Sequence, residues 1–295
     1  MFYRLKLNAD CIIKKTLKIS GFLFGIATIL LAFISWDNLG ITNVCSRIAI
    51  LIAILVFSLI ISSIYILCIK KSYTVWECGT GKITVRYSDI INEGFKKNIK
   101  NEKIIVIPVN TCFDTIIDSD ISTSSKPLVS PKTIHGQWIK SMNDIGISSE
   151  TLNNKIENYL NEKNIKPVKK LSREVKRQGN LLSYKYGTIV PIRGNENVTF
   201  YLLALSEFDK NNTAQSSVDT IIECIQKLVK FYNINGQGFD MYLPLMGTNL
   251  SRAGMSHSES LQKTKSVLEL YNNQIHGSIN IVIYYKDKNK VTLSS

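Results

Sequence analysis

Two uncharged apolar segments near the start of the chain constrain its fold more than any other feature. Residues 19–35 (ISGFLFGIATILLAFIS) and residues 48–69 (IAILIAILVFSLIISSIYILCI) carry no charge, and charged residues flank both. A helix needs about 20 predominantly apolar residues to cross a bilayer, so the second segment is long enough and the first just reaches this length. We therefore predict a transmembrane hairpin in residues 1–71, with spans at about 19–36 and 48–69. A secretory signal is the alternative for the first segment, but no small-residue cleavage pattern follows it.

Basic residues flank the predicted hairpin on its outer sides. They are Arg4, Lys6, Lys14, Lys15 and Lys18 before the first span, and Lys70 and Lys71 after the second. The loop between the spans, residues 36–47, holds a single basic residue. Because positive residues favour the cytoplasmic side, we expect a multi-pass protein with both termini in the cytoplasm and residues 72–295 as a cytosolic domain.

The charge and the cysteine content narrow the possible partners only in part. The net charge of +13 fits an anionic ligand, an anionic lipid leaflet or nucleic acid, and charge alone does not choose among them. The basic run in residues 163–177 is most often a solvated helix or linker face. The six cysteines show no C-x-x-C spacing and the chain has three histidines, so we expect no metal site.

The pattern after the hairpin indicates an α/β domain. Short apolar runs rich in β-branched residues predict strands at 83–87, 104–109, 188–192, 198–205, 239–245 and 279–285. Apolar residues at helical spacing predict helices at 149–162, 216–231 and 256–271. The last three strands alternate with the last two helices, which implies parallel strands and a ligand crevice at their carboxyl ends.

Polar residues follow three of the predicted strands. Asp89 can accept hydrogen bonds from an adenine amino group, Asn110 offers a donor and an acceptor to a ribose hydroxyl, and the loop from Gly247 can wrap a pyrophosphate. Each also has a structural reading, as a helix N-cap, a strand-ending turn and a strand-to-helix connection respectively. Their joint placement predicts a site for an ADP-ribose type of ligand. The candidate binding residues are Asp89, Ile90, Asn110, Thr111, Gly247, Thr248, Asn249, Leu250, Ser251 and Arg252.

The same segments resemble a known family. The succession of SDI (88–90), IPVNT (107–111) and PLMGTNLSR (244–252) at the ends of predicted strands is similar to the macro domain, the α/β fold that binds ADP-ribose and its derivatives. With SPKTIHGQWI (130–139), LLALSEF (202–208) and the hairpin, the chain resembles Thoeris-type antiphage effectors that carry two transmembrane helices and a divergent macro domain. The resemblance implies a three-layer α/β/α macro-like domain in residues 72–295.

This resemblance implies an immune role at the bacterial inner (cell) membrane. A partner TIR-domain enzyme consumes NAD on infection and makes an ADP-ribose derivative, such as an amino-acid conjugate. The macro domain binds this diffusible signal, the chain forms a homo-oligomer, and the membrane part acts on the lipid bilayer to cause abortive infection. We expect no further cofactor and no nucleic-acid partner.

The resemblance also implies roles for individual residues. It places Asp89 and Ile90 at the adenine, Asn110 near the distal ribose, residues 247–251 around the diphosphate, and Arg252 on a phosphate or the attached group. Hydrolytic macro domains carry a glycine run where this chain has DTIIDSDIS (114–122), so we expect binding without turnover and assign no catalytic residue. Two alternatives stay open: a membrane-bound hydrolase of an ADP-ribose derivative, and a tethered reader of ADP-ribosylated proteins. His135 is either a ligand contact or a hydrogen-bonded loop histidine.

Overall fold

The chain forms two compact units, Met1–Lys71 and Ser72–Ser295. The structure is a computed structural model, and it describes residues 2–117, 128–176, 178–194, 197–208, 214–248 and 253–295. Residues 118–127 and 249–252 lie outside the described part, and the second of these segments holds four of the candidate binding residues. Those four are Asn249, Leu250, Ser251 and Arg252.

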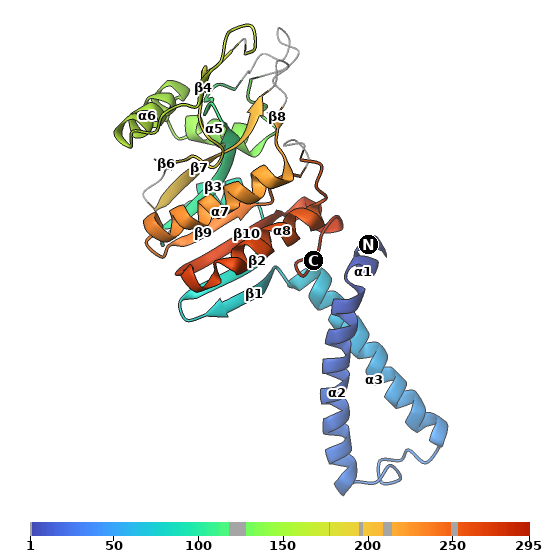
Figure 1. The fold of residues 1–295 in the computed structure, drawn as a ribbon. Helices are drawn as coiled ribbons and strands as arrows, with labels where there is room; N and C mark the ends of the chain where they lie inside the picture. Colours follow the sequence, from blue (N-terminus) through green and yellow to red (C-terminus); the bar gives the residue numbers. More distant parts are fainter. Residues whose placement is uncertain (1, 118–127, 177, 195–196, 209–213, 249–252) are drawn as a thin grey trace. The chain divides into compact units, whose positions relative to one another are not determined.

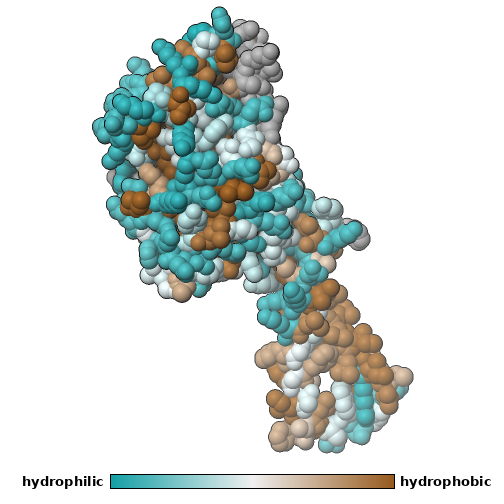
Figure 2. All heavy atoms as spheres, in the orientation of Figure 1, coloured by the Kyte–Doolittle hydropathy of each residue, from teal (hydrophilic) through white to brown (hydrophobic). Residues whose placement is uncertain are grey.

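The first unit is helical (Figure 1). Its elements are α1 (Phe2–Leu7), α2 (Ala9–Phe33), α3 (Val44–Ile64) and a π-helical turn, η1 (Tyr65–Ile69). α2 and the α3–η1 segment have mean hydropathies of 1.9 and 2.9 over their most apolar stretches, and little of either stretch is buried. By length and composition, each could cross a membrane, and Figure 2 shows apolar residues gathered along this unit. α2 begins ahead of the predicted span because Lys14, Lys15 and Lys18 are good helix formers, although they lie outside the apolar segment.

The second unit is built on one eight-stranded sheet. Its strands are β1 (Ser72–Cys78), β2 (Gly81–Ser88), β3 (Lys103–Asn110), β6 (Ile189–Arg193), β7 (Val198–Phe208), β8 (Ala214–Gln215), β9 (Asp240–Pro244) and β10 (Gly277–Tyr284). The strand order is β1-β2-β10-β9-β3-β7-β6, and β8 pairs with β7. The five strands from β2 to β7 in this order are parallel, and β1, β6 and β8 are antiparallel to their neighbours. A separate small hairpin joins β4 (Lys169–Lys170) to β5 (Leu182–Ser183).

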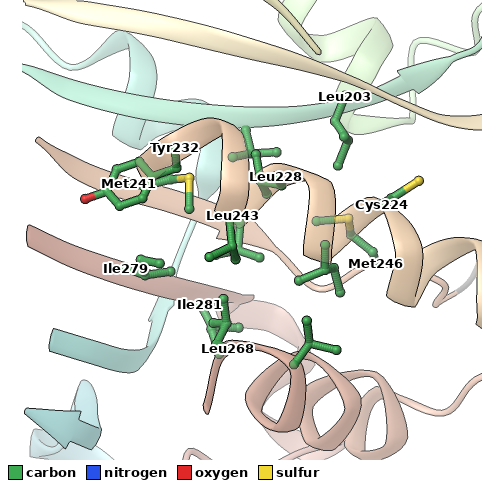
Figure 3. Close-up of a cluster of buried hydrophobic side chains, with 14 of the residues drawn as sticks. Leu203, Cys224, Leu228, Tyr232, Met241, Leu243, Met246, Leu268, Ile279 and Ile281 are labelled. Atoms are coloured by element: carbon green, nitrogen blue, oxygen red, sulfur yellow. The ribbon is translucent and has the colours of Figure 1, made fainter. Parts of the chain in front are cut away.

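Helices cover both faces of the sheet, which confirms the predicted α/β class and its three layers. They are α4 (Ile90–Phe95), α5 (Ile134–Asp144), α6 (Ser149–Glu162), α7 (Val218–Asn235) and α8 (His257–Leu270), with 3₁₀ turns η3 (Asn272–Gln274) and η4 (Tyr285–Asn289). α7 and α8 pack on one face, where Leu228, Leu243 and Ile281 meet in the core (Figure 3). α4, α5 and α6 pack on the other face around Ile107 and Trp138.

Both core clusters consist only of residues beyond Ser72. Burying apolar side chains is the main driving force of folding, and the second unit does this without a side chain from the hairpin. We therefore expect residues 72–295 to fold on their own.

Candidate functional site

The strand order of the sheet reverses between β3 and β9, which makes this pair a topological switch point. These strands are adjacent and parallel, with Ile105 opposite Tyr242. From β3 the chain leads to β6 and β7 on one side, whereas from β9 it leads through α8 to β10 on the other. Ligands of open α/β sheets bind at the carboxyl ends of the strands at such a point. Asn110 ends β3 and Gly247 follows β9, so the structure brings these two predicted residues to neighbouring strand ends.

Asp89 also lies at the carboxyl ends of the parallel strands, because it follows β2, and it is the N-cap of α4. Its Oδ1 accepts hydrogen bonds from the backbone N–H groups of Ile91, at 2.9 Å, and Asn92, at 3.3 Å. This satisfies two N–H groups that the first turn of a helix leaves unpaired. The next residue, Ile90, is 6% exposed and packs in the core on the α4 side. The structural reading of Asp89 as a cap therefore holds, and a contact with adenine remains a proposal.

Asn110 is buried, and its side chain is largely occupied within the protein. Its Oδ1 accepts from the backbone N–H groups of Cys112 and Asp114, both at 3.2 Å, and its Nδ2 donates to Asp114 Oδ2 at 2.8 Å. An amide side chain has two acceptor sites and two N–H donors, so one N–H of Asn110 is not used in these bonds. Thr111 is equally buried, and its hydroxyl accepts from Ser183 at 3.0 Å.

Asp114, which accepts a hydrogen bond from Asn110, also forms a buried ion pair that the sequence did not reveal. Lys176 Nζ lies 2.5 Å from Asp114 Oδ2, and their side chains are 1% and 0% exposed. The ammonium also donates to the carbonyl of Asn180 at 2.7 Å, and the N–H of Asn180 donates to Asp114 Oδ1 at 2.7 Å. The general reading of residues 163–177 as a solvated basic face is thus wrong at Lys176. The network fixes the turn after β3, where Phe113 has a φ of +51°.

A small cavity opens beside this network at the carboxyl ends of β3 and β7. Its volume is about 80 Å³, and it is lined by Asn110, Thr111, Cys112, Lys169, Leu171, Val175, Lys176, Ser183, Glu207 and Phe208. Drug-sized ligands occupy pockets of roughly 300 to 1,000 Å³, so this cavity suits one group of a larger ligand. A partly exposed ion pair of 2.8 Å joins Lys169 to Glu207 in its lining.

Cys112 in the cavity lining is not an activated nucleophile. Burial raises the pKa of its thiol above the ordinary value, and the nearby Lys176 ammonium opposes this effect only in part. The thiolate is the nucleophilic form, so a raised pKa keeps Cys112 protonated and unreactive at neutral pH.

Gly247 has a backbone conformation that favours glycine. Its φ is +81°, and a Cβ atom there would overlap side-chain atoms of Met255 and Ile221. A positive φ is strained for other residues, and these neighbours belong to the core of the domain. A bulky residue at 247 would therefore disturb the protein itself, and it is a poor probe of ligand approach.

Two exposed tyrosines at the same edge are functional candidates that the sequence analysis missed. Tyr284 ends β10 opposite Ser88 of β2, next to Asp89, and Tyr285 follows it. The two residues are 40% and 44% exposed, and their ring centroids lie 4.8 Å apart. The sequence pattern assigned both to the end of an apolar strand, and only the position of that strand end beside β2 places them near Asp89. Lys286 Nζ lies 5.9 and 6.0 Å from the two ring centroids.

His135 lies in the first turn of α5 and not in a loop. It is 6% exposed and stacks on Trp138, with ring centroids 6.4 Å apart. Burial lowers its pKa to about 3, and a hydrogen bond with the backbone of Asp114 acts in the opposite direction. The imidazole is therefore neutral at physiological pH, and its hydrogen bond with the backbone of Asp114 links α5 to the turn after β3.

This burial predicts a pH dependence of stability. Below pH 6.5 the unfolded chain takes up a proton at His135 that the folded chain does not, so the free energy of unfolding falls as the pH drops towards 3. The loss from this site amounts to about 1.4 kcal/mol per pH unit. We expect the loss to be smaller in His135→Gln, measured by urea unfolding of residues 72–295 between pH 7 and pH 4. An NMR titration that gives His135 a pKa above 6 in the folded protein would contradict the prediction.

A mixed sheet with a parallel centre and helices on both faces is the architecture of a macro-type domain. The chain belongs to the ThsA macro-domain family, because the family described as Thoeris protein ThsA, Macro domain, matches residues 83–284. This confirms the resemblance drawn from the sequence.

The individual proteins that the chain resembles have low sequence identity to it. Thoeris protein ThsA from Bacillus amyloliquefaciens (strain Y2) is 25% identical over 150 residues, which is 50% of this chain and 44% of that relative. The chain thus spans less than half of the length of the curated relative it matches. Among solved structures, the Oceanobacillus iheyensis macrodomain with ADP has 10% identity and a TM-score of 0.44, over 74% of this chain and 90% of that one. The Trypanosoma brucei macrodomain in complex with ADP-ribose has 10% identity and a TM-score of 0.38, over 70% and 66%.

Proposed function

We propose that this protein is a membrane-anchored antiphage defence effector whose macro domain binds an ADP-ribose derivative. The observation that carries the proposal is the match of residues 83–284 to the ThsA macro-domain family. The signal is made by a TIR-domain enzyme and reaches the protein by diffusion. The two apolar helices hold the protein in the bacterial cell membrane with both termini in the cytoplasm, and signal binding triggers membrane disruption and abortive infection through a homo-oligomer.

The strand ends offer chemistry that fits such a ligand. The exposed residues Tyr284 and Tyr285 provide aromatic rings on which a base can stack beside Asp89. Gly247 and Thr248 can offer backbone N–H groups to a phosphate, and the following segment, which lies outside the described residues, contributes the cation of Arg252 by sequence. The remaining N–H of Asn110 and the adjacent cavity then lie towards the distal ribose and its attached group.

The same geometry supports binding without turnover. Asp114 is the first carboxylate after Asn110, and its oxygens are occupied by Lys176, Asn110 and Asn180. A carboxylate held in this way is a poor general base, because base catalysis needs an oxygen within reach of the attacking water. We therefore propose that the protein is a ligand sensor and not a hydrolase of an ADP-ribose derivative. Incubation of the protein with ADP-ribose and with amino-acid conjugates of ADP-ribose, followed by chromatography, tests this choice, and stoichiometric recovery of each ligand supports the sensor.

The aromatic pair gives a specific test of the binding site. Base stacking contributes about 1 to 3 kcal/mol in protein complexes, so Tyr285→Ala should weaken ADP-ribose binding by about fivefold or more. The matched control, Tyr285→Phe, keeps the ring and should bind like the unmodified protein. Calorimetry of residues 72–295 with ADP-ribose measures both affinities. Equal affinities for the alanine and phenylalanine variants would remove the base from this surface.

A further inference from the structure

One buried carboxylate on α4 is surrounded by three cations. Glu93 is 3% exposed, and its Oε1 accepts a hydrogen bond from the hydroxyl of Ser88 at 2.5 Å. Its carboxylate oxygens lie 3.0 Å from Lys96 Nζ, 3.6 Å from Lys103 Nζ and 3.9 Å from Arg86 Nη2. The three cations come from β2, from the end of α4 and from the start of β3, and we call them the α4 cation cluster.

The α4 cation cluster carries more positive charge than Glu93 neutralises. Three positive charges against one negative charge leave an excess of two among these four side chains. Asp240, the exposed register partner of Lys103 on β9, reduces this excess to one if it is counted as well. Burial lowers the pKa of Lys103, and the charges of Lys96 and Arg86 act in the same direction, whereas Glu93 opposes them. The cations therefore repel one another, and a further anion would relieve the repulsion.

Two members of the cluster also keep hydrogen-bond donors for another acceptor. The contacts of Lys103 and Arg86 with Glu93, at 3.6 and 3.9 Å, are longer than hydrogen bonds. Arg86 Nε is buried, and it has no hydrogen-bond partner in the part of the chain that the structure describes. A buried donor without an acceptor costs free energy, and a bound acceptor removes this cost.

The ring of Tyr242 holds the same two cations near each other. Arg86 Cζ lies 5.4 Å and Lys103 Nζ lies 5.3 Å from the ring centroid, which are distances typical of cation–π contacts. Tyr242 is the register partner of Asn280, which accepts a hydrogen bond of 2.7 Å from Thr84. The sheet beside the cluster is therefore lined by an aromatic ring and paired polar groups, and it is suited to a polar ligand.

The cluster is separate from the candidate site at the strand ends. Lys103 begins β3, whereas Asn110 ends it. The two ends of a strand of this length are about 23 Å apart, because each residue advances the strand by about 3.3 Å. A small anion that contacts Lys103 is therefore not the group that the cavity beside Asn110 receives.

We propose that the α4 cation cluster is a binding site for a phosphate monoester. Such a group carries up to two negative charges and has three terminal oxygens, which accept hydrogen bonds from Arg86, Lys103 and Lys96. The planar guanidinium of arginine matches the geometry of phosphate, and lysine adds point charges. The group is either free in solution or the headgroup of a lipid such as phosphatidic acid. This inference goes beyond the proposed function and does not depend on it.

Calorimetry of residues 72–295 with inorganic phosphate tests the site. The ionic strength is held constant with chloride, and ADP-ribose is present so that the strand-end site is occupied. We expect Arg86→Gln and Lys103→Gln each to weaken phosphate binding by about fivefold or more. The matched control, Lys97→Gln, removes an exposed lysine next to Lys96 and should stay within about twofold of the unmodified protein. If circular dichroism shows that Lys103→Gln is unfolded, Lys96→Gln, at a side chain 53% exposed, takes its place.

Glu93→Gln distinguishes a ligand site from an ion-pair network that only stabilises the fold. This change removes the negative charge inside the cluster, so phosphate should bind about threefold or more tightly. A network that serves only to neutralise Glu93 predicts no gain. Absence of saturable phosphate binding, no gain in Glu93→Gln, or an equal loss in Lys97→Gln would overturn the proposal.

A second probe identifies the source of the phosphate group. Dihexanoyl phosphatidic acid is soluble in water and carries the same monoester on acyl chains. Binding several times tighter than that of inorganic phosphate, and lost in Arg86→Gln, supports a lipid headgroup, whereas equal binding supports free phosphate. Lys103→Gln should leave the affinity for ADP-ribose within about twofold, and a larger loss would reject a separate site. Phosphate binding without any ADP-ribose binding would leave this site standing and reject the proposed function alone.

Discussion

Replacing Lys176 by methionine should lower the free energy of unfolding of residues 72–295 by about 3 to 5 kcal/mol. Methionine fills most of the space of the lysine side chain but leaves Asp114 as a fully buried carboxylate without its cation. An uncompensated buried charge is costly because the protein interior solvates it poorly. Urea unfolding followed by circular dichroism measures the change.

Two further variants separate this charge effect from a general loss of packing. Lys169→Met removes the cation of a partly exposed pair with Glu207 and should cost less than about 1 kcal/mol. Adding Asp114→Asn to Lys176→Met removes the unpaired charge, so the double variant should lose clearly less than the sum of the two single losses. Strict additivity, or equal losses at Lys176 and Lys169, would show that the buried pair does not act as a unit.

Removing residues 1–71 should abolish toxicity completely while leaving the affinity for ADP-ribose within about twofold of the full chain. The core of the macro domain lies entirely in the second unit, so the binding site should form without the hairpin. The hairpin contributes the exposed apolar helices, which are the part of the chain suited to lipid. Co-expression of each form with a TIR-domain partner, with growth and membrane potential recorded, measures toxicity.

A hairpin exchange makes this experiment specific. Replacing residues 1–71 by an unrelated two-span hairpin restores anchoring but not the native helix surfaces. If the exchanged protein reaches the membrane and remains harmless, the native hairpin itself carries the membrane action. If the truncated form still kills, the toxic activity lies in the macro domain, and the hydrolase becomes the better proposal.

The sequence predicted regular elements well where local signals were strong. The helix at 149–162 has the same bounds in the structure, the helix predicted at 256–271 is one residue shorter at each end, and the helix predicted at 216–231 starts two residues later and ends four residues later. Each of these helices follows a serine whose hydroxyl accepts from the first turn, at Ser148, Ser217 and Ser256. α4 was missed because it has only six residues. α5 was missed although Trp138, Ile139 and Met142 recur at helical spacing, because it is short, has a glycine in its first turn and carries few strongly apolar residues.

The candidate site was predictable only as a set of strand ends. Asn110 and Gly247 follow clear apolar runs, so their placement at one edge followed from the parallel order of the strands. The pairing of Asp114 with Lys176 joins residues 62 positions apart, and a lysine within a basic run gives no local sign that it is buried. Tyr285 was missed for a related reason, because its position near Asp89 depends on the pairing of β10 with β2.

The pairing of β2 with β10 determines when this protein becomes functional during its synthesis. Thr84 and Asn280 meet across these strands, although 196 positions separate them in the chain. A ribosome has therefore released the hairpin and begun every other strand before β2 can acquire its parallel neighbour. The apolar hairpin can enter a membrane early, whereas the ligand site is assembled only after the last strand emerges. Under the proposed function, an incomplete chain is anchored but cannot bind the signal, so translation that stops short yields an inactive effector.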